Sequence, residues 1–116
     1  MLAEYPERVK KLFISDKVAD QGIYGVWITK NGVRHQIVMD DYVPCAGDKP
    51  AFSQSHKGEL WPLILEKAWA KIHGSYERIE AGQAHLTMRD ITGAPAYEYF
   101  IEKTPNIFDI ILEADK

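Results

Sequence analysis

The chain has 116 residues, of which 46% are hydrophobic and 27% charged, the usual mixture of one globular domain. This composition excludes a disordered tail, a collagen-like repeat and a low-complexity linker. Because 17 acidic residues outweigh 14 basic ones, the formal net charge is −3, and we expect no nucleic-acid partner. No apolar run approaches the roughly 20 residues that span a bilayer, and early charges leave no room for a secretory signal. We therefore expect a cytoplasmic protein without a membrane span.

The first half of the chain predicts a helix followed by a β-hairpin. Apolar residues at three- and four-residue spacing over 2–13 indicate an amphipathic helix, with Pro6 in its first turn. Two β-branched and aromatic runs, 23–29 and 33–40, flank Asn31-Gly32. Asn-Gly is the strongest short hairpin signal because both residues accept positive φ. A turn-rich stretch follows, and 51–53 is a candidate for a short third strand.

The second half predicts two further helices around one strand. The longest helical pattern starts near Gly58 and continues to about residue 79; we expect its core contacts to centre on Trp61 and Trp69 and Gly74 to break it. The sequence over 81–95 looks irregular, and 97–102 alternates like a strand. Thr104 and Pro105 are typical of the start of a last, strongly apolar helix. The sum is an α+β fold: helix, β-hairpin, long helix, strand, helix.

The residues themselves show no assembled catalytic or metal-binding constellation. Cys45, the single cysteine, cannot form an internal disulfide; it is either a nucleophile approached by a histidine or a packing thiol in a loop. No two histidines have the i, i+4 spacing of a zinc-binding helix; they are His35, His56, His73 and His85. Asp40, Asp41 and Asp48 lack the spacing of a calcium loop and are typical of turn-capping residues. No glycine-rich phosphate-binding motif occurs.

Residues 58–99 carry a resemblance to a known family. The segment GELWPLILEKAWAKIHGSYERIEAG is similar to a helix of the calpain-type cysteine protease core, E-(F/L)-W-x-x-(L/I)-(L/I)-E-K-A-(Y/W)-A-K-(I/V)-x-G-x-Y-E. The matching positions are Glu59, Trp61, Leu65, Glu66, Lys67, Ala68, Trp69, Ala70, Lys71, Ile72, Gly74, Tyr76 and Glu77. Upstream, QIVMDDYVP resembles the family pattern V-x-x-D-D-x-x-P at Asp40, Asp41 and Pro44. Downstream, DITGA, YEYF and TPNIFDIIL look like its D-x-T-G-G turn, aromatic strand and final helix.

The resemblance implies a partial papain-like fold. In calpain-type cores two lobes face each other across a cleft, and a cysteine thiolate attacks the peptide carbonyl with a histidine as general base and acid. The family's cysteine lies in a G-x-C-W motif before the region that matches residues 1–3. Its histidine (G-H-A-Y) and asparagine (N-P-W-G) lie beyond the last helix. Neither Cys45 nor any histidine matches these motifs. Residues 1–116 are therefore expected to be one unit, a partial calpain-like catalytic domain without a catalytic residue.

Two residues match site positions of the family. Glu59 matches a glutamate that helps to ligate calcium in the first lobe, but one carboxylate cannot satisfy a cation that takes six to eight oxygens. Its alternative role is to stabilise a helix N-terminus. Gly82 matches a glycine whose backbone pairs with the substrate peptide, and its alternative role is a helix C-cap. The family usually has two glycines there, whereas this chain has Ala81 before Gly82, and it has Ala94 where a second glycine is common.

Two hypotheses about function follow, with an unrelated α+β binding module as a weaker third. In the first, the chain is a non-catalytic segment of a calpain-like protease core with a structural or interaction role, covered by a protein partner or by the remainder of a larger calpain-like chain. In the second, it belongs to an active calcium-dependent cysteine endopeptidase whose catalytic residues lie outside it. The chain itself is expected to hold no cofactor, with Ca²⁺ belonging to the intact family core. An exposed apolar patch is expected where the nucleophile-bearing helix would pack.

Overall fold

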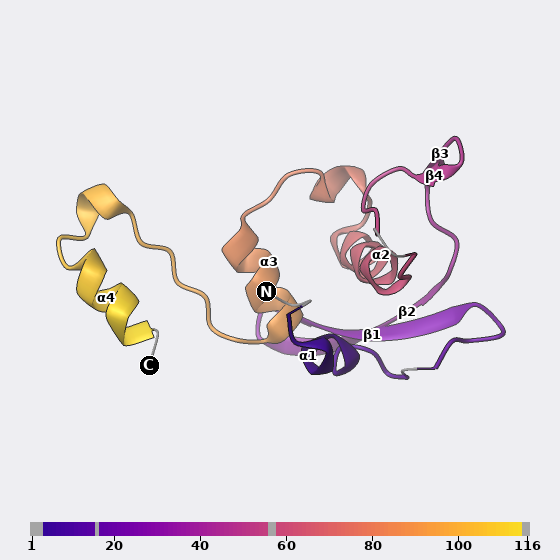
Figure 1. Ribbon diagram of the computed structural model, residues 1–116, viewed down its shortest axis with the longest axis horizontal. Coiled ribbons are helices and arrows are strands. Elements are labelled where there is room, and N and C mark those ends of the chain that lie inside the picture. The colour runs from indigo at the N-terminus through magenta and orange to yellow at the C-terminus, as the bar shows by residue number, and fades with distance from the viewer. Residues whose placement is uncertain (1–3, 16, 56–57, 115–116) are drawn as a thin grey trace.

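The computed structural model describes residues 4–15, 17–55 and 58–114 and has an α+β architecture, as predicted (Figure 1). Helices surround a β-hairpin in the body, residues 4–94, and the arm, residues 95–114, extends away from it and ends in a helix. The elements in chain order are α1 (Pro6–Lys10), β1 (Ile23–Lys30), β2 (Val33–Asp40), β3 (Cys45–Ala46), β4 (Lys49–Pro50), α2 (Trp61–His73), η1 (Glu77–Ile79), α3 (Ala84–Thr92), η2 (Ile101–Lys103) and α4 (Ile107–Ala114).

The predicted hairpin is confirmed. Strands β1 and β2 pair antiparallel, and the register extends from Ile23 opposite Asp40 to Lys30 opposite Val33. Asn31 and Gly32 form the turn with φ values of 51° and 77°, the positive φ that a two-residue hairpin requires. The sequence predicts this hairpin well because the Asn31-Gly32 turn and the two β-branched runs beside it indicate the same structure.

A segment after α1 extends the pairing along the other edge of β1. The Trp27 N–H donates to the Leu12 carbonyl (2.7 Å), and the Ile14 N–H donates to the Gly25 carbonyl (2.9 Å). A Cβ at Gly25 would lie only 2.5 Å from Ile14 Cδ1, so glycine allows this close approach. The predicted helix over 2–13 is therefore too long: α1 ends at Lys10, because the residues after it pair with β1. Leu2 lies outside the described residues.

The core lies between the hairpin and α2. Val26 and Ile28 project from the same face of β1 and are almost fully buried, at 0% and 1% exposed. The other core side chains are Leu12, Met39, Ile64, Leu65 and Ala68. Trp61 and Trp69 are half-buried and pack against this cluster, so the expectation that they form its centre is wrong. Their large rings border grooves, and the smaller aliphatic residues on α2 fill the space against the sheet.

The end of α2 agrees with the sequence, but the next segment does not. Gly74 adopts φ 103° and donates its N–H to the Ala70 carbonyl (2.8 Å), so it ends the helix as predicted. The expectation of irregular chain over 81–95 is wrong, because Ala84–Thr92 form α3, which packs against β1 and ends at Gly93 with φ 74°. Its apolar stripe is too short to stand out by periodicity, and its stability comes from packing.

Two predicted strands are absent from the described residues. No strand forms at 51–53; the pairing instead joins Cys45–Ala46 to Lys49–Pro50 across a tight turn with Gly47 at φ 63°. Residues 97–100 form no strand and lead into η2. An extended run becomes a strand only when a neighbouring strand pairs with it, and none of the described strands pairs with this one. The last helix begins at Ile107, two residues after the predicted Pro105.

Candidate functional site

The first candidate site is the groove that carries Gly82. This Gly82 groove lies between α2, η1, the 80–83 loop and α3, and it has a volume of about 520 Å³. Its walls combine the two tryptophans of α2 with polar and charged side chains. The polar side chains include Lys30, Ser53, Glu66, His73, Gln83 and Asp90. A groove with an apolar wall and a few convergent polar groups is the usual form of a ligand site.

Gly82 itself is exposed on this groove, and the fold does not demand a glycine there. Its φ lies outside the left-handed region, and an added Cβ would meet no atom within 4 Å. The alternative of a helix C-cap is wrong, since Gly74 caps α2 and Glu80 follows η1. A backbone without a Cβ at the edge of a groove permits close approach of an extended peptide. The role of Gly82 in substrate binding stays a prediction.

An ionic network around one buried carboxylate forms a wall of the Gly82 groove. The Asp90 side chain on α3 is only 2% exposed. Its Oδ2 accepts a hydrogen bond from Lys30 Nζ of β1 (2.9 Å), and its Oδ1 accepts one from Arg89 Nε (2.9 Å). Lys30 Nζ also lies 2.7 Å from His73 Nε2 at the end of α2. The network therefore ties β1, α2 and α3 together through charge-assisted hydrogen bonds.

The hydrogen-bond partners indicate the tautomer of His73 and lower the pKa of Asp90. His73 Nδ1 lies 2.9 Å from the Trp69 carbonyl, which can only accept, so Nδ1 carries the ring proton. Nε2 is then the ring nitrogen that accepts a hydrogen bond from Lys30 Nζ. Burial tends to raise the pKa of Asp90, but hydrogen bonds from Lys30 and Arg89 and their positive charge outweigh it and hold that pKa below its usual value. Asp90 is thus a stable carboxylate.

Sequence reasoning missed this network as a unit. The sequence indicates only a turn residue at Asp90, in DITGA, and a histidine without metal-ligand spacing at His73. The three residues are up to 60 positions apart, and no short motif relates them. Asp90 is the residue that could have indicated the network. It lies beside Ile91 on α3, which packs against β1, and a charged side chain buried at such a contact needs a partner of opposite charge.

Glu59, the predicted calcium ligand, lies at the start of α2 but outside it. Its N–H donates to Ser55 Oγ (2.8 Å), and the Ser55 hydroxyl donates to Glu59 Oε2 (3.1 Å). It lines a second groove, of about 460 Å³, together with Tyr24 and Trp61. Across residues 4–15, 17–55 and 58–114, no three His, Cys, Asp or Glu side chains are placed to hold a metal ion. These residues therefore do not complete the shell of six to eight oxygens that calcium takes.

The other chemically notable residues are separate from one another. Cys45 is exposed in β3, and its sulfur contacts the Val43 carbonyl (3.5 Å). His35 is exposed on β2, His85 lies on α3, and His56 lies outside the described residues. Asp40 is a turn-capping residue, as predicted: it accepts from the Tyr42 N–H (2.9 Å). The Lys67 ammonium on α2 also hydrogen-bonds Asp40 and lowers the pKa of that carboxyl.

Comparison with known proteins agrees with the family resemblance. Residues 1–116 match the family described as calpain family cysteine protease. The chain is 43% identical over 93 residues to the calpain-type cysteine protease DEK1 of Zea mays and 40% identical to DEK1 of Arabidopsis thaliana, covering 78% of this chain and 4% of each relative. It is 38% identical to Calpain-B of Drosophila melanogaster over 78% of this chain and 9% of that protein.

The chain therefore belongs to the calpain family of cysteine proteases. It spans less than a tenth of the length of these three relatives, so it corresponds to one part of such a protein. Its α+β architecture is that of a partial calpain protease core. Within the described residues, none of the helices has the length and apolar character needed to cross a bilayer.

Proposed function

We propose that this chain is a structural segment of a calpain-type protease core, resident in the cytoplasm, and that it cleaves no peptide bond by itself. The observation that carries the proposal is the position of Cys45. A catalytic thiol needs a lowered pKa from a helix N-terminus or a neighbouring cation, and a base within reach. Cys45 instead lies in the two-residue strand β3, with its sulfur directed to the Val43 carbonyl.

Peptidase activity of the 116-residue chain tests this proposal. We expect no cleavage of a fluorogenic peptide, with or without millimolar calcium, because the described residues offer no thiol–imidazole pair. Cys45→Ser is the matched control. Cleavage by the chain that Cys45→Ser abolishes would contradict the proposal, and cleavage that survives it would indicate a contaminant.

The second candidate function is membership of an active calcium-dependent cysteine endopeptidase whose catalytic residues lie in other parts of a longer polypeptide. The open groove around Gly82 and the small share of each relative that the chain covers favour it. In that setting the groove would hold the substrate backbone at Gly82, and Glu59 would give calcium one of its ligands. The sequence of the native polypeptide separates the two: G-x-C-W and G-H-A-Y motifs flanking these residues support the second function, and flanking sequence without them supports the first.

Calcium binding by the chain alone is expected to be weak. Glu59 accepts a hydrogen bond from Ser55, and the described residues form no group of three His, Cys, Asp or Glu side chains that could hold a metal ion. Titration calorimetry with calcium should therefore give no tight binding. Sub-micromolar affinity that Glu59→Gln removes would contradict this expectation.

A further inference from the structure

The loop that carries Gly82 depends on its two ends for its position. Residues 74–83 connect the end of α2 to the start of α3 through η1 (Figure 1). The η1 end packs against α2, and the Tyr76 ring beside it stacks on Phe52 with 5.0 Å between the ring centroids. Residues 81–83 are exposed, and an added Cβ at Gly82 would meet no atom within 4 Å. The place of Gly82 is therefore set by where α2 and α3 lie.

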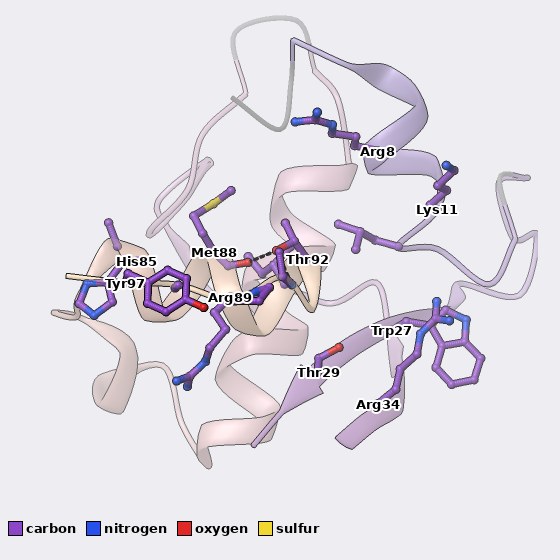
Figure 2. A pocket seen from close by; sticks show the side chains of 16 residues that line it. Arg8, Lys11, Trp27, Thr29, Arg34, His85, Met88, Arg89, Thr92 and Tyr97 are labelled. Atoms are coloured by element: carbon purple, nitrogen blue, oxygen red, sulfur yellow. Dashed lines mark hydrogen bonds between the residues drawn. The ribbon is translucent and has the colours of Figure 1, made fainter. Parts of the chain in front are cut away.

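Helix α3 is fixed through its second half. Asp90 is buried, and a Cβ at Gly93 would lie 3.2 Å from Thr29 Oγ1, so the end of α3 lies against β1. Figure 2 shows Thr92 of α3 and Thr29 of β1 in this region. The first residue, Ala84, is exposed. It lies about 9 Å from Asp90 along the helix, at a rise of about 1.5 Å per residue. A small tilt of α3 at Asp90 would therefore move the loop.

Lys30 joins the two helices at the ends of this loop. Side chains alternate between the faces of a strand, so Lys30 projects from the face of β1 that contributes Ile28 to the core. Its Nζ lies 2.7 Å from Nε2 of His73, the last residue of α2, and donates to Asp90 Oδ2 on α3 (2.9 Å). The same ammonium lies 5.3 Å from the centroid of the Trp69 ring on α2. An ammonium has three N–H donors, so this one side chain can hold both helices.

Arg89 does not replace Lys30 in this role. Its Nε donates to Asp90 Oδ1 (2.9 Å), but both residues belong to α3, so the pair does not reach α2. Without the Lys30 ammonium, Asp90 would keep one cation, and α3 would lose this ionic contact with α2.

We infer that Lys30 is a positioning residue for the peptide site at Gly82, because it fixes the two helices between which the Gly82 loop extends. The inference rests on the second candidate function, in which the substrate backbone lies at Gly82. A peptide that pairs with the backbone there needs that backbone at one fixed place, and a loop already ordered before binding avoids the entropy cost of ordering it.

His73 makes this contact sensitive to pH. Its Nδ1 faces the Trp69 carbonyl, so a second ring proton would lie on Nε2 and face the Lys30 ammonium, placing two donors against each other. Histidine is the side chain whose charge ordinarily changes between about pH 5 and 8. The charged side chains that line the groove beside His73 are Lys30, Glu66, Arg78, Arg89 and Asp90. Protonation would thus separate Lys30 from α2 and leave it on Asp90.

NMR relaxation of the backbone amides of the 116-residue chain tests the inference. The order parameter of Gly82 should be near the rigid-backbone value of about 0.85, and Lys30→Met should lower it below about 0.6. Lys49→Met, at an exposed position of β4, is the matched control and should leave Gly82 unchanged. If Lys30→Met unfolds the body, the double change Lys30→Met with Asp90→Asn removes both charges and gives the same readout. An unchanged order parameter at Gly82 in a folded variant would overturn the inference.

The pH profile separates positioning from a merely structural role. Between about pH 7.5 and about pH 5.5 the order parameter of Gly82 should fall in the native chain, while that of Gly47 in the β3–β4 turn stays constant. His73→Gln keeps an acceptor that takes up no proton, so Gly82 should then not respond to pH. His35→Gln, on β2, should keep the native response. A native chain without a response, or a response that survives His73→Gln, would contradict the inference.

These measurements are independent of the proposed function, because no substrate enters them. A longer polypeptide that contains these residues and neither binds nor cleaves peptides would count against the second candidate function alone. An ordered Gly82 loop without Lys30 would count against the positioning role alone.

Discussion

The body and the arm are both rich in apolar residues, but only the body covers them. In the body, Val26, Ile28 and Ile64 are at most 1% exposed because the hairpin and α2 enclose them. In the arm, Phe100 and Ile101 are 58% and 78% exposed, and α4 packs against no other element to a comparable degree. The arm thus exposes apolar side chains that no described element covers, and the patch predicted where the nucleophile-bearing helix would pack stays a prediction. A helical apolar pattern predicts that a helix exists, but not that a partner is present to bury it.

The largest expected difference comes from one substitution made in both regions. Ile64→Ala removes a buried side chain and should lower the free energy of unfolding by about 2–5 kcal/mol. Ile111→Ala makes the same change on α4, where the side chain is more than half exposed, and should stay within about 0.5 kcal/mol. Chemical denaturation measures both. Equal losses would mean that the arm packs on the body.

The ionic network around Asp90 should make the free energy of unfolding of the body depend on pH in acid. The arm has no such network among its described residues, so we expect no comparable dependence there. The folded-state pKa of Asp90 is below its unfolded value of about 3.9, so the stabilisation is complete above pH 4 and is lost as pH falls through the folded pKa. Asp90→Asn should cost about 1–3 kcal/mol at pH 7, and its deficit should shrink in acid. Asp109→Asn, on exposed α4, serves as the control. A deficit for Asp90→Asn that is the same at pH 7 and pH 2 would show that the lost stability is not ionic.

A smaller effect concerns an unsatisfied group within the body. The Tyr76 hydroxyl is buried without a hydrogen-bond partner in the described structure, and its ring stacks on Phe52 at 5.0 Å. Tyr76→Phe keeps the ring and should stabilise the body by up to about 1 kcal/mol. Burial, with the nearby charges of Glu66 and Asp40, raises the pKa of Tyr76, so the native chain should lose stability above pH 10 relative to this variant. Tyr97→Phe in the arm should change nothing; a destabilised Tyr76→Phe would reveal a partner for the hydroxyl.

The sequence predicted the elements whose signals are local. Asn31-Gly32 specifies the hairpin and Gly74 ends α2, because each effect depends on one or two backbone conformations. The strand expected over 97–102 is absent, since pairing depends on a neighbour that the pattern does not reveal. Helix α3 was missed because packing against β1 stabilises it more than its own periodicity does.

The residues of the candidate site also differ in whether a local sequence pattern indicates them. Gly82 was found through a motif of the family, and the structure places it on an open groove. The network of Lys30, His73 and Asp90 was not found, since it forms only when β1, α2 and α3 pack together. Contacts between residues up to 60 positions apart leave no local signal in a single sequence.

Amide hydrogen exchange of the 116-residue chain tests the difference between the body and the arm most directly. The amides of Val26, Ile28 and Ile64 should exchange only through global unfolding of the body. The amides of α4 should exchange at about the rate of amides in an isolated short helix. Strong protection of α4, or fast exchange at Val26 and Ile28, would contradict this account.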